Sequence, residues 1–580
     1  MLHEEEKEKE HSHDGDSAAN KEYDWVEEEG SKRLKSNLHM AARNGDLQTM
    51  QELHRMDPES MNARDKKRKT PLHMACRKGS FEVAEFLVNC GAELDPVDAQ
   101  GDTPLVKAAR LGNSRLMELL VEHGANVHVQ DEKGETLLHK VCKRFNTNRR
   151  HIARWLVSEK GLNANAENIY GQTPLTAAMT LGHCPKLCKL LVELGADCNV
   201  IDEEGKTPLH LECKAIGDLK LSDREKREWR LNLVADLIQR GANLNSRDTG
   251  GLTPLKLHVI AIEEPDQSEY EDHPEDSEAQ LCMLIKLLLS QEGLDVNLPD
   301  NEGMTPLHHM AYKLRYWVNP GLIIGPMKLL LGDKRTNANV IDGRGDTPLH
   351  LACGEKNSAE IVSLLIKKGA DVLQKQGAGE GLSPLHLAIE HGRDPASINL
   401  LIEADPRTLE MEDCNGEKPL HVSCRLDIAM AKLLLEKGAD PNVQREKDGW
   451  TPLHICSESG QLESAKTLLS CGAKVHVNNC KDGLTPLHVA CRGNHLKLAE
   501  LLLEKGANPN APRESNRWTP LHEACDAGVV DRVQFLLAKG ADVNAESSDS
   551  LKPLHVAAKG NKCEVVWFLL RKYPSLVMEE

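Results

Sequence analysis

The sequence predicts a mainly α-helical solenoid, built from short units that repeat along the chain. The tetrapeptide Thr-Pro-Leu-His occurs seven times, and eight variants of it fill the gaps between these copies. The shared Leu advances by 33 or 34 residues at most steps, a period that is typical of stacked repeats. Aromatic residues make up only 3% of the 580 residues, as expected for a core of Leu, Ala, Val and Cys on closely packed helices. The period therefore indicates one array, in place of the about four globular domains that this length would otherwise suggest.

The repeated tetrapeptide defines fifteen units. The full copies lie at Thr70–His73, Thr207–His210, Thr305–His308, Thr347–His350, Thr451–His454, Thr485–His488 and Thr519–His522. The variants lie at Ser36–His39, Thr103–Val106, Thr136–His139, Thr173–Thr176, Thr253–Lys256, Ser383–His386, Lys418–His421 and Lys552–His555.

Each unit contains the signals for two short helices and a turn. The Thr or Ser hydroxyl can cap the first free N–H groups of a helix, and Pro at the first helical position lacks the N–H that would have no partner there. The Leu then begins an apolar stripe, and a Gly such as Gly79 ends the helix. A second apolar helix follows, as in Leu498–Glu504, and it stops at Gly506. A polar turn such as Asp448 and Gly449 leads into the next unit.

These units resemble the ankyrin repeat, and the resemblance extends in register from about Lys35 to Val577. It implies a β-hairpin finger followed by two antiparallel helices in each unit. The fold class is therefore expected to be an ankyrin-repeat solenoid of β-hairpin plus helix-turn-helix units, stacked as a curved superhelix. Each unit buries its apolar face only against its neighbours, so the units depend on one another.

Four segments follow from the regularity of the repeats. Residues 1–33 form an acidic N-terminal segment, and residues 34–205 contain repeats 1–5. Residues 206–342 contain irregular repeats 6–8, each with an insert between its two helices, and residues 343–580 contain repeats 9–15. The stack either continues through the irregular repeats or breaks there.

Two acidic segments account for the whole net charge of −18. Residues 1–30 and residues 263–278 each carry a net charge of −9. Both segments lack apolar periodicity, which predicts disorder. The rest of the chain is neutral overall, which argues against extensive nucleic-acid binding.

The cysteines indicate a reducing compartment. Seven of the 17 occupy one equivalent helix position, where a free Cys acts as a small buried hydrophobe. They are Cys76, Cys142, Cys213, Cys353, Cys424, Cys491 and Cys525. No apolar stretch approaches the roughly 18 residues of a membrane span, and the N-terminus has no secretory signal. The predicted location is cytoplasmic or nuclear.

No group of residues makes a strong candidate for a catalytic, cofactor or metal site. The sequence therefore predicts neither an enzyme nor a cofactor or metal site. Twelve of the 26 histidines occupy the repeat position, where the resemblance implies hydrogen bonds within and between repeats. His183, Cys184 and Cys188 lie close together, but nothing nearby completes a set of four zinc ligands. No segment outside the repeats is both long and apolar enough to fold as a catalytic domain.

Four asparagines match the pattern that asparaginyl hydroxylases modify in ankyrin repeats. Each has a Leu eight residues earlier and an Asp two residues earlier. They are Asn199, Asn297, Asn442 and Asn544. The alternative is that each Asn only stabilises its turn, and the two roles are compatible.

The predicted function is a scaffold or adaptor, monomeric by itself, that binds other proteins on the concave face of fingers and first helices. Trp450 and Trp518 directly precede the tetrapeptide, while Ile169 and Tyr170 lie at a finger tip. Such side chains are favoured at interface hot spots, although the Trp rings could instead lie on a neighbouring finger and stabilise the stack.

Two further features leave alternatives open. Lys66 and Lys67 belong to a basic run that could contact an acidic partner, act in nuclear import, or form a solvated finger tip. The alternatives to a scaffold are a regulatory subunit that brings an enzyme to its substrates and a spacer without a binding site. Exposed finger aromatics would favour binding over a spacer.

Overall fold

In a computed structural model, the repeats of the chain divide into two units. The structure describes residues 29–143, 148–180, 185–220, 223–262, 274–315, 321–356, 358–377, 379–392, 394–426 and 428–577. The first unit contains the described residues up to Thr249 except Lys220, and the second begins at Gly250. The boundary between them therefore lies inside the irregular segment that the sequence predicted at residues 206–342.

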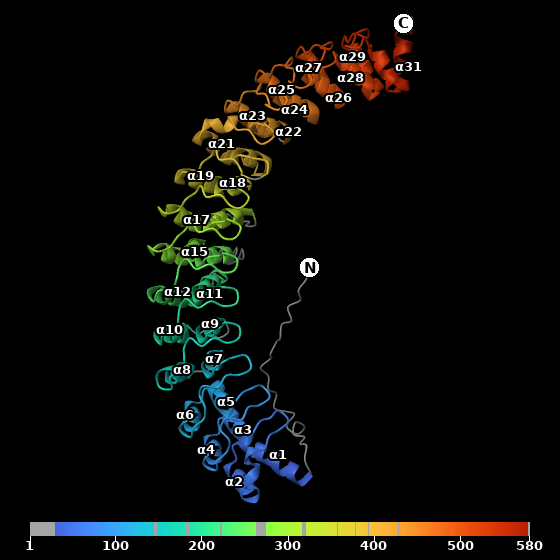
Figure 1. Ribbon diagram of the computed structural model, residues 1–580. Coiled ribbons are helices and arrows are strands. Elements are labelled where there is room, and N and C mark those ends of the chain that lie inside the picture. Colours follow the sequence, from blue (N-terminus) through green and yellow to red (C-terminus); the bar gives the residue numbers. More distant parts are fainter. Residues whose placement is uncertain are drawn as a thin grey trace. The chain divides into compact units, whose positions relative to one another are not determined.

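The first unit alternates inner and outer helices along the chain. The inner helices begin the repeats, and each outer helix runs back beside its inner partner (Figure 1). The inner helices are α1 (Glu29–Asn44), α3 (Pro71–Lys78), α5 (Pro104–Leu111), α7 (Leu137–Cys142), α9 (Pro174–Thr180) and α11 (Pro208–Gly217). The outer helices are α2 (Leu47–Met56), α4 (Phe81–Asn89), α6 (Ser114–Glu122), α8 (Arg149–Ser158), α10 (Pro185–Glu193) and α12 (Arg224–Gln239). The short η1 (Pro58–Asn62) follows α2.

The second unit repeats the same alternation. Its inner helices are α13 (Pro254–Ala261), α16 (Pro306–Tyr312), α18 (Pro348–Cys353), α20 (Pro384–Leu387), α22 (Pro419–Leu426), α24 (Pro452–Ser459), α26 (Pro486–Arg492), α28 (Pro520–Ala527) and α30 (Pro553–Lys559). Its outer helices are α15 (Pro274–Leu289), α17 (Gly321–Gly332), α19 (Ala359–Lys368), α21 (Pro395–Ala404), α23 (Ile428–Glu436), α25 (Leu462–Ser470), α27 (Leu496–Glu504), α29 (Val530–Ala538) and α31 (Cys563–Lys572). Short helical turns lie at η2 (Lys313–Arg315), η3 (Ala388–Gly392), η4 (Pro406–Glu410) and η5 (Pro574–Val577).

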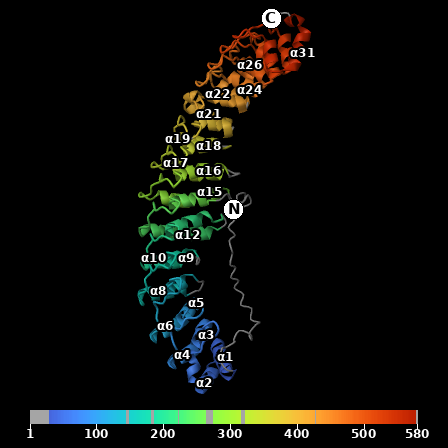
Figure 2. The ribbon, with the colours of Figure 1, turned by 45° about the vertical axis from the view of Figure 1, so that its right-hand side comes forward.

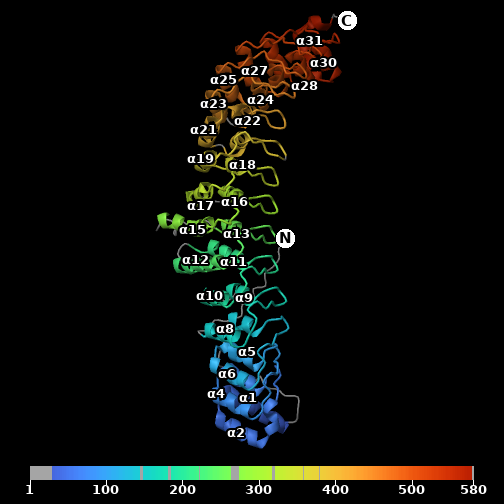
Figure 3. The same ribbon diagram turned by 60° about the vertical axis from the view of Figure 1, so that its left-hand side comes forward.

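Within each unit the elements form three layers. Outer helices such as α10 and α19 lie on one side, inner helices such as α9 and α18 form the middle layer, and the finger loops project beyond them (Figures 2 and 3). Successive inner helices pack on one another, as α3 does on α5 and α24 on α26. Within each unit, successive repeats therefore pack mainly through their inner helices and present their fingers on one common side.

The tetrapeptide starts the inner helices as predicted. At Thr70 the hydroxyl accepts the N–H of His73, while the imidazole of His73 accepts the N–H of Thr70. This reciprocal cap satisfies two N–H groups that would otherwise lack partners. Gly79 ends the helix with a φ of 87°, a left-handed conformation that Gly adopts without a steric penalty.

The core lies between the two helix layers and is aliphatic. The shared Leu of the tetrapeptide is buried in every repeat, as Leu72 and Leu453 illustrate. The seven repeat-position cysteines are buried and free, as predicted. Burial raises the pKa of Cys491 and Cys525 to about 12, so these thiols stay protonated and pack as small apolar groups.

The fingers differ from the expected β-hairpins. In the described part of the chain they contain no strand, and one isolated antiparallel bridge joins Gln130 and Thr136. Each finger is instead a tight loop that is closed by single backbone hydrogen bonds, such as Asp98 N–H to the Asp102 carbonyl at 3.0 Å. A single such bond does not make the ladder of hydrogen bonds that defines a β-hairpin.

A helix begins inside each of the two acidic segments that were predicted to be disordered. Helix α1 begins at Glu29, inside residues 1–33, and α15 begins at Pro274, inside residues 263–278. Pro at the first position suits a helix start, and α15 then carries the apolar face that packs on α17. Residues 1–28 and 263–273 lie outside the described residues, as do Tyr316 and Trp317 of the repeat 8 insert.

Candidate partner-binding surface

An Asp side chain fixes the turn of most fingers. Asp98 Oδ1 accepts the N–H groups of Gln100 at 2.9 Å and Asp102 at 3.0 Å. Burial acts to raise the pKa of Asp98, but the ammonium of Lys107 at 2.7 Å and these N–H groups outweigh it and hold the pKa below its ordinary value. The charge of the Asp98 carboxylate, which shapes the finger base, is thus neutralised within the protein.

The repeat-position histidine links each inner helix to the next finger. His454 Nδ1 accepts the N–H of Thr451 at 3.2 Å, so its Nε2 carries the proton and donates to the Leu484 carbonyl at 2.9 Å. His421 and His488 make the same bond to the carbonyls of Trp450 and Trp518. The geometry requires a neutral imidazole, since a protonated ring has no acceptor.

Burial keeps these imidazoles neutral. It lowers the pKa of His73, His421, His454 and His488 to about 4, although the carbonyl that each ring contacts acts in the opposite direction. Their role is therefore structural. The finding agrees with the predicted hydrogen bonds within and between repeats.

Repeat 7 replaces this imidazole with an ammonium. Lys256 is fully buried, and its Nζ donates to the Gly251 carbonyl at 3.0 Å and reaches the Met304 carbonyl at 3.5 Å. The Met304 carbonyl occupies the position that accepts the imidazole N–H in other repeats, directly before Thr305. The buried lysine thus joins two fingers and is not an exposed reactive amine.

The two candidate Trp rings lie on their own repeats. Trp450 exposes 8% of its surface, and its ring lies 5.8 Å from that of His454 and 5.4 Å from the Arg445 guanidinium. Trp518 is half-buried, stacks on His522 at 6.0 Å and lies 5.0 Å from the Arg513 guanidinium. Residues four positions after and five before each Trp thus form its contacts, and Trp450 offers little surface to a partner.

Ile169 and Tyr170 lie at an exposed finger tip. Their exposed fractions are 65% and 40%, and the Ile169 N–H donates to the Lys133 carbonyl of the preceding finger at 3.0 Å. Ile201 on the following finger is 59% exposed, and a Cβ at Gly171 would lie 3.6 Å from its carbonyl oxygen. We call Ile169, Tyr170 and Ile201 the fingertip patch. Sequence reasoning missed Ile201, although an apolar residue directly before a turn Asp was a signal.

Lys66 and Lys67 lie on the finger of repeat 2 and are exposed. The Lys67 carbonyl accepts the N–H of Ala99 on the next finger at 2.9 Å. Arg68 has a φ of 59° at the turn position that most other repeats fill with Gly, so the basic run continues through a left-handed turn. The run is separate in sequence from the fingertip patch and lies three fingers before it.

A polar groove crosses the fingers of the second unit. It has a volume of about 320 Å³, and finger residues together with α22 line it. Glu417 lies in this groove between two guanidinium groups, with Arg445 Nη1 at 2.7 Å and Arg425 Nη1 at 3.2 Å. The Glu417 carboxylate is therefore paired inside the protein.

The candidate hydroxylation asparagines bridge consecutive repeats. Asn442 Nδ2 donates to the Gly472 carbonyl at 3.1 Å, and its Oδ1 accepts the Lys474 N–H at 2.7 Å. Asn199 and Asn297 make the equivalent pairs with the repeats that follow them. For Asn544 the described residues show no side-chain hydrogen bond to another repeat.

The described residues contain no group of three or more His, Cys, Asp or Glu side chains that could hold a metal ion. Cys188 is buried in α10, whereas His183 and Cys184 lie outside the described residues. No described helix combines the length and the apolar character that crossing a bilayer requires.

Comparison with known proteins identifies the repeats. The family model described as ankyrin repeats (3 copies) matches in overlapping segments over residues 38–221 and 276–578. The chain is 30% identical over 181 residues to the ankyrin repeat protein nuc-2 of Neurospora crassa, covering 31% of this chain and 16% of that protein.

Two other relatives match over shorter stretches. The target of rapamycin complex 2 subunit AVO2 of Saccharomyces cerevisiae is 33% identical over 99 residues, which are 17% of this chain and 23% of that protein. The NF-kappa-B inhibitor alpha of Sus scrofa is 33% identical over 100 residues, which are 17% of this chain and 32% of that protein. The matches thus span less than a third of each of these relatives.

Proposed function

Because this chain belongs to the ankyrin-repeat family, we propose that it is a non-catalytic scaffold or adaptor that binds partner proteins through its fingers and inner helices. Ankyrin repeats are protein–protein interaction modules. The proposal extends this general role to one surface, the fingertip patch of the first unit. We further propose that the protein acts in the cytoplasm or nucleus, where its free buried thiols stay reduced.

The fingertip patch is the observation that supports this surface. Three large apolar side chains lie exposed on two neighbouring fingers, at 65% for Ile169, 40% for Tyr170 and 59% for Ile201. Large exposed apolar patches on protein surfaces mark interaction sites. A Tyr ring also combines apolar area with a polar hydroxyl, which favours it at interfaces.

The relatives support protein binding in general terms. One is an inhibitor of NF-kappa-B by name, and another is a subunit of the target of rapamycin complex 2. Both names describe proteins that act by associating with other proteins. They do not extend to the partner of this chain, since each match is a short run of repeats.

A spacer without a binding site is the weaker alternative. A spacer needs no exposed aromatic on its fingers, whereas Tyr170 is exposed. A regulatory subunit that brings an enzyme to its substrates would use the same surface, so it differs from a scaffold only in the identity of its partners.

The fingertip patch is tested by quantitative affinity capture from cells. The full-length protein is compared with the variant Ile169→Ala, Tyr170→Ala and Ile201→Ala combined, and captured proteins are quantified by mass spectrometry. We expect the variant to lose a defined set of partners at unchanged thermal melting, because hot-spot truncation typically weakens binding by about 2 kcal/mol or more.

The matched control is Met56→Ala, which removes another exposed apolar side chain but lies on outer helix α2. It should retain the full partner set. Equal capture by the wild-type protein and the triple variant would place the binding surface elsewhere.

Two secondary proposals concern modification and charge. We propose hydroxylation at Asn199, Asn297, Asn442 and Asn544, which peptide mass spectrometry would detect as a gain of one oxygen.

We also propose that Lys66 and Lys67 contact an acidic partner segment, and charge reversal to Glu at both positions should then weaken capture of that partner.

A further inference from the structure

A groove between two outer helices of the first unit gathers cationic side chains. It lies between α8 and α10, the outer helices of repeats 4 and 5, on the side of the unit away from the fingers (Figure 1). Its volume is about 510 Å³, which is within the range of small-molecule sites. The residues that line it are Asn148, Arg150, His151, Arg154, Lys186, Lys189, Leu190 and Glu193.

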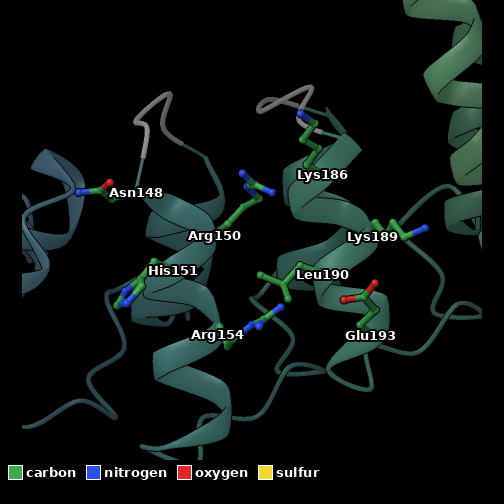
Figure 4. A pocket seen from close by; sticks show the side chains of 8 residues that line it. All are labelled: Asn148, Arg150, His151, Arg154, Lys186, Lys189, Leu190 and Glu193. Atoms are coloured by element: carbon green, nitrogen blue, oxygen red, sulfur yellow. The ribbon is translucent and has the colours of Figure 1, made fainter.

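The cations come from both helices. Figure 4 shows Arg150 and Arg154 extending from α8 toward α10, and Lys186 projecting from the first turn of α10. All three side chains are exposed to solvent. Lys189 adds a fourth positive charge, and its Nζ forms an ion pair with Asp236 Oδ2 at 3.0 Å. Glu193 is the one acidic residue in the lining.

Three of these cations have no anionic partner among the described residues. Arg150, Arg154 and Lys186 form no ion pair there, whereas Lys432 and Lys466 of other outer helices pair with Glu436 and Glu463. Guanidinium groups supply several N–H donors in a fixed plane, which suits phosphate oxygens. The groove thus presents donors that the protein itself leaves unused.

The local sequence concentrates positive charge against the trend of the chain. Residues 136–192 contain nine Lys and Arg and only two acidic residues, although the whole chain has a net charge of −18. Such a local excess raises the potential over the groove and attracts anions.

Arg150 and Lys186 lie at helix N-termini, where a positive charge without a bound anion is electrostatically unfavourable. Arg150 is the second residue of α8 and Lys186 the second residue of α10, and neither first turn contains an acidic residue. A helix N-terminus carries a partial positive charge that disfavours cations and favours anions. A bound anion would relieve this repulsion at both helix ends.

We propose that the groove between α8 and α10 binds a small, soluble, multiply phosphorylated molecule, in a site separate from the fingertip patch. Arg150, Arg154 and Lys186 would contact its phosphate oxygens, with Lys189 at the rim. A compact ligand matches a groove of this volume better than an extended polyanion such as nucleic acid or a membrane surface. The site goes beyond the proposed partner binding and gives the first unit a ligand of its own.

Isothermal titration calorimetry with inositol hexakisphosphate as the probe tests the site, using the full-length protein at physiological salt. We expect saturable binding at one site. The variant Arg150→Gln and Arg154→Gln combined should bind the probe at least tenfold more weakly while its thermal melting is unchanged.

The control variant is Lys432→Gln and Lys466→Gln combined. These lysines follow the buried Ala of α23 and α25, as Arg154 follows the buried Ala153 of α8. The control therefore removes the same number of positive charges from outer helices, at the position that Arg154 occupies in α8. Its affinity for the probe should change less than twofold. Equal losses in the two variants would show non-specific charge attraction and overturn the proposal.

Two further arms distinguish other sources of phosphate. The protein is mixed with vesicles that contain phosphatidylinositol bisphosphate and, separately, with a doubly phosphorylated peptide. Absence of binding to the soluble probe overturns the proposal, whether or not the vesicles or the peptide bind. Binding to the soluble probe with loss in the Arg variant supports it.

Discussion

Two fingers, one from each unit, place their large side chains differently. In the first unit Ile169 and Tyr170 stand exposed at a finger tip, whereas in the second unit Trp450 lies against His454 and Arg445. The Trp precedes the helix cap, so its ring can reach the imidazole four residues later. The tip residues have no such neighbour in their own repeat. An apolar finger residue therefore stabilises the stack or remains free for a partner according to its distance from the cap.

The histidine network extends this difference, because the second unit holds more of the strongly shifted imidazoles. Burial lowers the pKa to about 4 for His421, His454 and His488 in the second unit and for His73 in the first. In the unfolded chain the pKa returns to about 6.5. Stability from the neutral ring is thus complete above pH 6.5 and is lost as the pH falls from 6.5 toward 4.

Acidification should therefore have the largest effect, and it should weaken the second unit more than the first. At pH 5 we expect a loss of roughly 1–2 kcal/mol for each strongly shifted imidazole, which sums to several kcal/mol in the second unit. Hydrogen exchange of amides in the two units, measured at pH 7 and pH 5 and corrected for intrinsic rates, reports this loss separately. Equal loss of protection in both units would show that these imidazoles do not set the acid stability.

The substitution Trp450→Ala should have the second-largest effect on stability. Removing a buried ring leaves a cavity beside His454 and exposes the cap, at a cost of about 2–4 kcal/mol in the local stability. Trp518→Ala should cost about half as much, since its ring is half-buried. Thermal melting and exchange of the α24 and α28 amides measure both effects. Lost partner capture at unchanged melting would reverse the comparison and make Trp450 a binding residue.

The asparagine bridges should have a smaller effect that is equal in the two units. Asn199→Ala in the first unit and Asn442→Ala in the second each remove two hydrogen bonds between repeats, which we expect to cost about 1–2 kcal/mol. Asn544→Ala is the matched control and should cost less than about 0.5 kcal/mol. Urea denaturation compares the three variants, and a large effect of Asn544→Ala would contradict the bridging role.

Tyr170→Ala should have the smallest effect on stability, below about 0.5 kcal/mol, because the ring is exposed. The same variant should weaken partner capture. A melting temperature that falls as far as that of Trp450→Ala would show that the finger tip packs on its neighbours, and the contrast between the two units would disappear.

Local sequence signals predicted the repeat architecture well. The Thr and Pro of the tetrapeptide start the inner helices at Pro71 and Pro452, and Gly79 and Gly460 end them with positive φ. These features depend on hydrogen bonds within a few residues, so they are visible in the sequence. The predicted burial of the repeat-position cysteines followed from the same register.

The fingers and the acidic segments were predicted less well. The expected β-hairpins are loops, and α15 begins at Pro274 inside a segment expected to be disordered. The acidic residues at the start of α15 led to the prediction of disorder, although the helix also has an apolar face that packs against α17. A charge count cannot reveal such a face, because its value depends on the neighbouring helix.

The sequence by itself determined the number of repeats, the helix boundaries and the capping chemistry, since each rests on residues that are close along the chain. Only the tertiary structure decided which finger side chains remain exposed. It buried Trp450, left Ile201 exposed on the finger that follows Tyr170, and brought Arg150 and Arg154 to a groove that Lys186 of the next repeat completes. Those outcomes depend on contacts between repeats about 30 residues apart, where side-chain length and the spacing of stacked helices determine which surfaces meet water.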